Sequence, residues 1–259
     1  KWKYKISASN SDFDFVEYGP NAYPSLLYNA MVNPLVGLSM QGVIWYQGEN
    51  NTNRAKEYYH LFPAMINDWR KKWGKDFPFY WVQLANYMDA VEVPSESLWA
   101  QVREAQTQTL SLSHTGQAVI IDIGEAKDIH PKNKQEVGRR LALHALHNDY
   151  GFSDVVCESP MPKTVRRVQD KIVVQFDNVA DGLIVKNKYG YLMSFAVAGN
   201  DGVYKWVQAK VAGKDRVVLS CPDVIDPVSV RYAWGDNPDD ANLYNSVGLP
   251  ATPFEIKIE

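Results

Sequence analysis

Apolar runs alternate with amphipathic helical patterns over the first 150 residues, and this alternation constrains the fold more than any other feature. The runs at 42–46, 77–84 and 118–123 have the length and composition of strands that are buried on both faces. A helical pattern follows each of them. The clearest pattern ends at Gly74 and places apolar side chains at i, i+3, i+4, i+7, i+8, i+11 and i+15: Tyr58, Leu61, Phe62, Met65, Ile66, Trp69 and Trp73. This order of elements predicts a parallel sheet with helices on both faces.

Two further helices are predicted in the same region. One extends from about Ser95 to Leu112. The other begins at Asn133, a favourable N-cap residue, with Glu136 at the third following position as in a capping box. Both segments present an apolar stripe that a sheet would cover.

The pattern changes after about Gly151. Pro160 and Pro162 predict a linker, and short strand-like runs separated by turn residues follow: 172–176, 183–185, 192–197, 204–211, 217–219 and 228–232. This spacing is typical of all-β units. We therefore expect two domains, an α/β catalytic domain over residues 1–152 and a small β-sandwich-like domain over residues 153–259.

Bulk composition excludes some classes of function. Lys and Arg total 27 and Asp and Glu total 30, for a net charge of −3, so a nucleic-acid partner is not expected. No run approaches the ~20 apolar residues of a membrane span, and no apolar leader segment occurs between Lys1 and Asn10. Cys157 and Cys221 are too few for a disulfide framework, and their pairing is left open.

The loop after the first predicted strand contains Gln47, Gly48, Glu49 and Asn50. Ligands of parallel α/β sheets bind at the carboxyl ends of strands, where this loop lies. A glycine that allows close backbone approach, next to amide side chains that donate hydrogen bonds, is what an oxyanion hole requires. The alternative is a polar loop whose following residues, Asn51 and Asn53, cap the next helix.

The loop after the third predicted strand carries Asp128 and His130. A histidine beside a carboxylate at the same sheet edge could act as a general base and its orienting acid. Otherwise His130 is an exposed surface histidine. His144 and His147 have a helical spacing that can hold a metal, but no cluster of ligand residues accompanies them, so no metal site is expected.

No nucleophile elbow of the form Gly-x-Ser-x-Gly occurs in the sequence. The segment at 37–42 resembles it, but precedes a strand. Ser39 would therefore lie at the amino edge of the sheet, opposite His130, and is not favoured as a nucleophile.

Several segments together resemble the sialate O-acetylesterase family, a branch of the SGNH serine hydrolases. They agree with it in order and spacing over most of the chain: YPSLLYNAMVNP at 23–34, GVIWYQGEN at 42–50, REAQ at 103–106, DIHPKNK at 128–134, VGRRL at 137–141, RYAWGDNP at 231–238 and GLPATPF at 248–254.

The resemblance implies a flavodoxin-like SGNH-hydrolase sheet and a serine esterase without metal or cofactor. Such an enzyme removes acetyl groups from sugar hydroxyls, in sialic acid or in acetylated polysaccharides, and is secreted or periplasmic. His130 matches the catalytic histidine of the family. Gln47, Gly48 and Asn50 match its oxyanion loop, where Glu49 is expected to support them.

Two departures from the family pattern matter. Its nucleophile lies in a Gly-Gln-Ser-Asn-Met element that this sequence lacks, so the serine is expected outside this chain, on an N-terminal segment or a second copy. The acid is expected three residues before the histidine, where this sequence has Lys127; Asp128 is our choice, with Asp122 and Glu125 as rivals. A non-catalytic carbohydrate-binding protein on the same fold is the alternative function.

Overall fold

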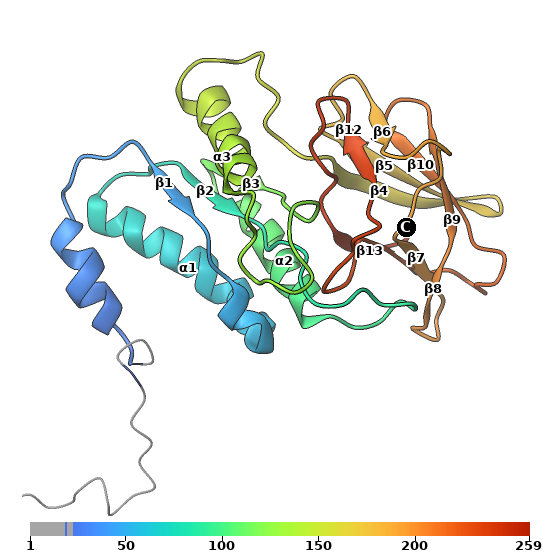
Figure 1. Ribbon diagram of the computed structural model, residues 1–259, viewed down its shortest axis with the longest axis horizontal. Coiled ribbons are helices and arrows are strands. Elements are labelled where there is room, and N and C mark those ends of the chain that lie inside the picture. Colours follow the sequence, from blue (N-terminus) through green and yellow to red (C-terminus); the bar gives the residue numbers. More distant parts are fainter. Residues whose placement is uncertain (1–18, 20–22) are drawn as a thin grey trace, which may run out of the picture.

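The computed structural model describes residue 19 and residues 23–259 (Figure 1). The segment from Lys1 to Asn10, for which no leader was predicted, lies outside the described residues, as does the beginning of the predicted first domain.

A three-stranded parallel sheet forms the centre of the N-terminal part. Its strands β1 (Val43–Trp45), β2 (Phe79–Val82) and β3 (Thr115–Ala118) lie in the order β1-β2-β3. Ile44 pairs with Tyr80, and Trp81 pairs with Gln117. All of β2 is buried, which explains its apolar sequence. The predicted parallel sheet is confirmed.

Helices cover both faces of this sheet. Phe79 and Trp81 point to one face and pack in a core cluster with α1 (Ala55–Trp73) and α2 (Leu98–Gln108). Tyr80 and Val82 point to the other face and pack against α3 (Lys134–Asp149). The described residues of this part also form the short helices η3 (Tyr28–Val32), η4 (Asn33–Leu35), η5 (Glu49–Arg54) and η6 (Thr109–Ser111).

The helix ends follow the sequence signals. α1 ends at Gly74, whose φ of 62° is the left-handed conformation of a C-terminal glycine. The side chain of Asn133 accepts a hydrogen bond from the Glu136 N–H at the start of α3. The prediction was wrong at one apolar position of α1. Leu61 is 51% exposed, because the buried face of the helix is centred on Tyr58, Phe62 and Ile66.

The third strand differs from its prediction at 118–123. Ladder pairing ends at Ala118, and the buried residues 119–121 leave the sheet. The side chains of Val119 and Ile121 pack into the core of the C-terminal part, and the Val119 carbonyl accepts a hydrogen bond from Arg140 at 2.6 Å. The apolar run at 118–123 therefore reflects burial between the N-terminal and C-terminal parts, and only its first residue belongs to the strand.

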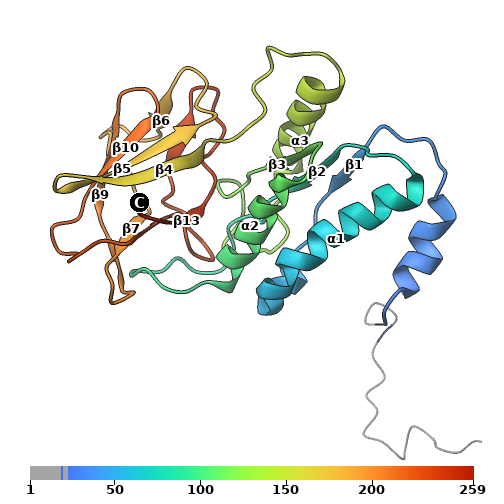
Figure 2. The same cartoon turned by 180° about the vertical axis from the view of Figure 1, so that it is seen from behind.

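Antiparallel sheets build the C-terminal part, which stands beside α2 and α3 in both views (Figures 1 and 2). One four-stranded sheet has the order β4-β5-β10-β9, the second has the order β13-β11-β7-β8, and β12 pairs with β6. Buried side chains from both larger sheets form one core, so the predicted β-sandwich-like architecture is confirmed. The strands are β4 (Met161–Val168), β5 (Lys171–Asp177), β6 (Leu183–Val185), β7 (Phe195–Ala198), β8 (Tyr204–Trp206), β9 (Gln208–Ala212), β10 (Arg216–Ser220), β11 (Ser229–Tyr232), β12 (Leu243–Asn245) and β13 (Phe254–Lys257).

The predicted linker at Pro160 and Pro162 is shorter than expected. Pro162 lies inside β4, next to a register shift between Pro162 and Thr164. An edge strand tolerates proline because one of its backbone edges has no ladder partner, and β4 is the edge of its sheet. The domain boundary at 152/153 stays a prediction.

Two observations concern the remaining bulk expectations. Cys157 and Cys221 are both free and buried. Within residue 19 and residues 23–259, no helix combines the length and the apolar character needed to cross a membrane.

Candidate functional site

The loop after β1 is built around Gly48, which is buried and has φ 150°. A Cβ atom at this position would lie 3.1 Å from Nε2 of Gln106 and 3.3 Å from Cδ2 of Leu84. Both the backbone conformation and the lack of space therefore require glycine. The loop main chain is held against the end of β2 and against α2.

Gln47 is fixed by hydrogen bonds at both ends of its side-chain amide. Its Nε2 donates to Oδ1 of Asn51 at 2.7 Å, and its Oε1 accepts from the Tyr58 hydroxyl at 3.0 Å. Asn50 is exposed, and its side chain makes no hydrogen bond with the part of the chain that the structure describes. The loop thus offers one positioned amide and one free amide beside Gly48.

The capping alternative for this loop does not hold. The N-cap residue of α1 is Arg54, and no side chain caps it. Asn51 instead accepts its hydrogen bond from Gln47. Glu49, half-buried, begins η5, and its carbonyl accepts from the Thr52 hydroxyl at 2.9 Å.

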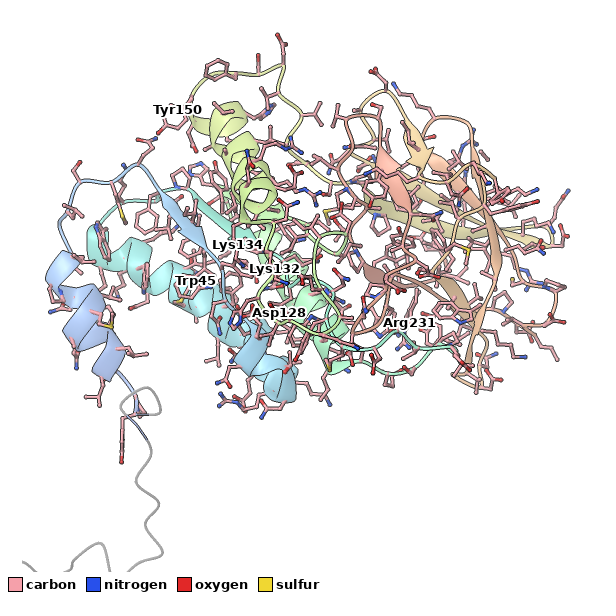
Figure 3. The ribbon with its side chains drawn as sticks, in the orientation of Figure 1. Trp45, Asp128, Lys132, Lys134, Tyr150 and Arg231 are labelled. Carbon is pink, nitrogen blue, oxygen red and sulfur yellow. The ribbon has the colours of Figure 1, made fainter. Side chains whose placement is uncertain are left out.

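A contact joins this loop to the start of α3. Lys134 Nζ lies 4.7 Å from the centroid of the Tyr46 ring. Burial, with the charge of Glu49 as a second cause, raises the pKa of the Tyr46 hydroxyl, which therefore stays neutral. The loop that precedes α3, which carries Asp128 and His130, thus approaches the same sheet edge (Figure 3).

His130 projects into solvent, with 87% of its side chain exposed. Oδ1 of Asp128 accepts the backbone N–H of His130 at 2.9 Å and lies 3.8 Å from the imidazole Nδ1. The carboxylate therefore shapes the turn and lies within ion-pair distance of the ring, without a hydrogen bond to it. Ile129 packs against the core formed with α1 and α2 and anchors the turn between these two residues.

The rival carboxylates are engaged elsewhere. Asp122 accepts two hydrogen bonds from Arg140, at 2.6 and 2.9 Å, and one from the Tyr244 hydroxyl at 3.3 Å. Glu125 forms an ion pair with Lys132 at 2.8 Å, which raises the pKa of that lysine. Among the described residues, Asp128 is the carboxylate within 4 Å of the His130 ring.

Ser39 is exposed and precedes β1, so it lies at the amino end of the sheet, as expected. His130 follows β3 at the opposite end. No serine in the described part of the chain hydrogen-bonds to the His130 imidazole. The structure therefore does not bring the predicted histidine and Ser39 together.

The histidines of α3 serve the core. The ring of His144 is stacked on Tyr80, with centroids 5.5 Å apart, and its Nε2 lies 3.1 Å from the Gln117 carbonyl oxygen. Nδ1 of His147 lies 2.8 Å from the Val155 carbonyl oxygen. Over the described residues, no three His, Cys, Asp or Glu side chains gather where they could hold a metal ion.

Arg103 lies in the REAQ segment at 103–106 and was not predicted to have a role in the site. Its buried guanidinium donates to four carbonyl oxygens, those of Leu84, Ala85, Gly235 and Asp236, at 2.5–2.9 Å. Burial lowers its pKa to about 9, so it stays charged at neutral pH. Arg103 thereby ties the turn at 235–236 of the C-terminal part to the carboxyl end of β2.

Asn86 extends this connection to the histidine loop. Its Nδ2 donates to Oδ1 of Asn237 at 2.8 Å, and its Oδ1 accepts the Gly124 N–H at 2.7 Å. The Met88 N–H donates to the Ala126 carbonyl at 3.0 Å. The C-terminal part therefore helps to position the loop that carries His130. The sequence signal for this connection was the REAQ segment at 103–106, which contains Arg103.

Comparisons with known proteins show which family the chain resembles. A family model described as carbohydrate esterase, sialic acid-specific acetylesterase, matches residues 12–147. The chain is 31% identical over 264 residues to a sialate O-acetylesterase from Pongo abelii, covering 91% of this chain and 49% of that protein. It is 31% identical over 278 residues to the sialate O-acetylesterase of Rattus norvegicus, covering 94% and 50%.

A solved structure is also similar. It is described as a novel carbohydrate acetylesterase from Xanthomonas citri, with 45% sequence identity and a TM-score of 0.85, and the match covers 91% of this chain and 55% of that one. The chain thus spans about half the length of the relatives that it matches.

Proposed function

Because this chain belongs to the carbohydrate esterase family of sialic acid-specific acetylesterases, we propose that it is the histidine-bearing part of a carbohydrate O-acetylesterase. Its substrates are O-acetylated sugars, in sialic acid or in acetylated polysaccharide, and it acts outside the cytoplasm. One observation carries the proposal: the buried Gly48 loop follows β1 and the exposed His130 loop follows β3, on either side of β2 in one parallel sheet and inside the region that the family model matches.

The reaction would proceed through an acetyl-enzyme. A serine hydroxyl from outside this sequence attacks the acetyl carbonyl carbon, and His130 accepts its proton. The protonated imidazole passes this proton to the departing sugar oxygen as the ester bond breaks. His130 then takes a proton from water, whose oxygen attacks the acetyl-serine. The imidazolium returns this proton to the serine oxygen as the acetyl–oxygen bond breaks, which releases acetic acid and restores the free serine.

Gly48 and an amide of Gln47 or Asn50 would stabilise the oxyanion. The support for this role is the rigidity of the loop, since preorganised donors need no rearrangement when charge develops. Loss of one such donor typically costs about 10²–10³ in rate. Gln47 already has both ends of its amide engaged, so Asn50 is the freer donor of the two.

Asp128 would orient His130. Its Oδ1 lies 3.8 Å from Nδ1, and catalytic hydrogen bonds are often longer before substrate is bound. A small rotation of the exposed imidazole would close this gap. Asp122 would instead support the fold, since its removal leaves the buried Arg140 with Glu136 as its one remaining carboxylate partner among the described residues.

Among the described residues no strand pairs with the outer edge of β1, and the strand that brings the serine would pair there. β1 is the first strand of the sheet order, and Ile44 is 71% exposed on it. A segment that pairs with this edge, either upstream sequence or a second copy, would add a parallel strand. The carboxyl end of that strand would lie beside Gly48, which is where a nucleophile is needed.

Acetate release from an aryl acetate and from O-acetylated sugars tests the proposal. We would compare the intact enzyme, this chain alone, and the intact variants His130→Ala, Asp128→Asn and Asp122→Asn. His60→Ala is the matched control, because His60 is an exposed histidine on α1. We expect His130→Ala to lose about 10²–10⁴ in rate and Asp122→Asn to lose stability first.

Three outcomes would contradict parts of this account. Activity within about tenfold of wild type in His130→Ala would exclude the histidine as general base. Activity of this chain alone that depends on His130 would place the serine inside this sequence. An intact protein that binds sugars and releases no acetate would be the non-catalytic carbohydrate-binding protein.

A further inference from the structure

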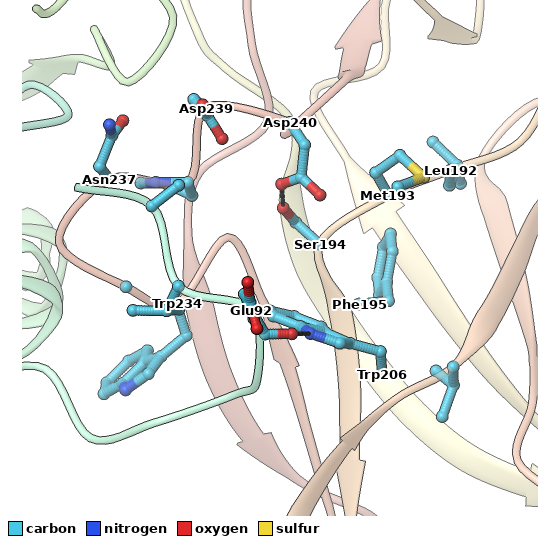
Figure 4. A pocket seen from close by; sticks show the side chains of 15 residues that line it. Glu92, Leu192, Met193, Ser194, Phe195, Trp206, Trp234, Asn237, Asp239 and Asp240 are labelled. Carbon is cyan, nitrogen blue, oxygen red and sulfur yellow. Dashed lines mark hydrogen bonds between the residues drawn. The ribbon is translucent and has the colours of Figure 1, made fainter. Parts of the chain in front are cut away.

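A cavity of about 370 Å³ lies between the loop after β2 and the β7–β8 hairpin (Figure 4). This volume is within the range of small-molecule sites. Its lining is mostly apolar and includes Phe195, Met193 and Trp206, with a small number of polar groups. None of the residues proposed for catalysis lines it.

Trp206 presents a fixed aromatic surface to this cavity. Its indole N–H donates to the Glu92 carbonyl oxygen at 2.9 Å, which joins β8 to the loop after β2. The side chain nevertheless remains 42% exposed. A large aromatic ring that is held in place and left open can pack against the apolar C–H face of a sugar ring.

Carboxylates provide the charged groups of the lining. Glu92, Asp239 and Asp240 border the cavity, and Ser194 donates a hydrogen bond to Asp240. No Lys, Arg or His of the described residues lines the cavity. Arg231 stands behind Trp234, with its guanidinium 4.9 Å from the ring, and pairs with Glu96 and Glu255 at 2.7 Å.

This charge pattern selects among ligands. Carboxylates accept hydrogen bonds from hydroxyl groups, whereas like charge and desolvation disfavour an anionic ligand. The three carboxylates do not gather into a metal-binding cluster in the described part of the chain. The cavity therefore suits a neutral, hydroxyl-rich ring with one apolar face.

We propose that this cavity is a binding subsite for a neutral pyranose unit of a glycan. Asn237 contacts both the cavity and the loop after β2. It lines the cavity, accepts a hydrogen bond from Asn86, and donates to the Met88 carbonyl at 2.7 Å. Met88 in turn bonds to the histidine loop at Ala126. The cavity wall is thus connected to the loop that carries His130 through Asn237 and Met88.

The subsite deepens the proposed function, on which its link to catalysis rests, by naming the substrate class. The glycan would be a neutral acetylated polysaccharide, since sialic acid carries a carboxylate that the cavity disfavours. Binding of the sugar itself does not depend on the esterase mechanism. The two claims can therefore fail separately.

Binding measurements on the intact enzyme carrying His130→Ala test the subsite without turnover. The probes are cello-, xylo- and manno-oligosaccharides and N-acetylneuraminic acid, followed by calorimetry and by tryptophan fluorescence. We expect one of the neutral series to bind at least tenfold more tightly than N-acetylneuraminic acid. Trp206→Ala should weaken that binding at least tenfold, and Trp206→Phe should weaken it less.

Tyr189→Ala is the matched control, because Tyr189 is 69% exposed in the same part and does not line the cavity. Asp239→Asn is a second variant that should leave the fold intact, because Asp239 is exposed. It should reduce the ratio of neutral-sugar affinity to N-acetylneuraminic acid affinity by several-fold. The inference is overturned if no neutral series binds, if N-acetylneuraminic acid binds as tightly, or if Trp206→Ala and Tyr189→Ala behave alike. Neutral-sugar binding through Trp206 in an intact wild-type enzyme that releases no acetate would overturn the proposed function and leave the subsite.

Discussion

Gln106 donates a hydrogen bond from its side-chain amide to the backbone carbonyl oxygen of Gln47 at 3.2 Å, across 59 positions of sequence. The same amide accepts the Leu84 N–H at 3.0 Å and donates to the Val82 carbonyl at 3.3 Å. A single buried side chain on α2 therefore connects the candidate oxyanion loop to the end of the central strand.

Replacing Gln106 with leucine should loosen that loop. The buried Leu84 N–H and Val82 carbonyl would lose this partner, and the Gln47 carbonyl would keep only its bond from the Tyr58 hydroxyl, so we expect a loss of about 1–3 kcal/mol in the free energy of unfolding. Displacement of the loop should also lower kcat of the intact enzyme by on the order of 10- to 100-fold. Urea titration and acetate release measure the two effects. Gln108→Leu, at an exposed position of the same helix, should stay within about 0.5 kcal/mol and serves as control.

Gly48 and Gly138 should respond oppositely to alanine. At Gly48 the Cβ meets Gln106 and Leu84 at a φ of 150°, and we expect a loss of about 1–3 kcal/mol together with lower activity. At Gly138, inside α3, a Cβ has nothing within 4 Å, and we expect a gain of about 0.4–1 kcal/mol. Thermal unfolding of both variants is the measurement. Equal shifts at the two positions would contradict the special conformation of the Gly48 loop.

Local patterns predicted those elements whose ends depend on nearby residues. Gly74 ended α1 and Asn133 began α3 because capping involves a few adjacent backbone groups. The alternating apolar runs predicted the parallel sheet and the candidate loops at its carboxyl edge. Periodicity failed at Val119 and Ile121, where burial against a distant part of the chain replaces strand pairing.

Long-range polar contacts could not be predicted in the same way. Arg103 bonds to residues 235 and 236, and Asn86 to Asn237, at sequence separations of 132, 133 and 151. From the sequence alone, an arginine in a helix is expected to be exposed, and its burial becomes clear only when its acceptors are known. The role of the C-terminal part in supporting the histidine loop depends on such contacts, which is why the sequence showed the motif and not its purpose.

His144 should make the fold sensitive to mild acid. Burial, together with the neighbouring His147, lowers its pKa from 6.5 to about 4. Between these values the unfolded chain binds a proton that the folded chain does not, so stability is complete above pH 6.5 and falls as the pH falls toward 4. Each unit of difference is worth about 1.4 kcal/mol.

Urea titrations at pH 7.5 and 4.5 would measure this loss. Bonds to Arg139, and Arg140, lower the pKa of Glu136 from 4.5 to about 2, so its contribution is lost mainly between those two values and little of it falls in the range compared. The variant His144→Gln keeps a side chain that can bond to the Gln117 carbonyl and should show a smaller difference between the two pH values. An unchanged difference would assign the acid sensitivity to other groups.

The exposed edge of β1 should make the isolated chain associate. Ile44 is 71% exposed on an edge of the parallel sheet that no described strand pairs with, and the neighbouring segment adds exposed apolar side chains: Leu26, Leu27, Met31, Leu35 and Leu38. Such an edge offers backbone groups and apolar surface to a second chain, and a charged residue on it opposes pairing.

Ile44→Lys should therefore shift the isolated chain toward monomer in size-exclusion chromatography with light scattering. Ile225→Lys, at an 85% exposed apolar position away from this edge, should leave the distribution as in wild type. If both lysine variants dissolve the oligomers equally, net charge is the cause; if wild type is already monomeric at high concentration, the edge of β1 is protected in some other way.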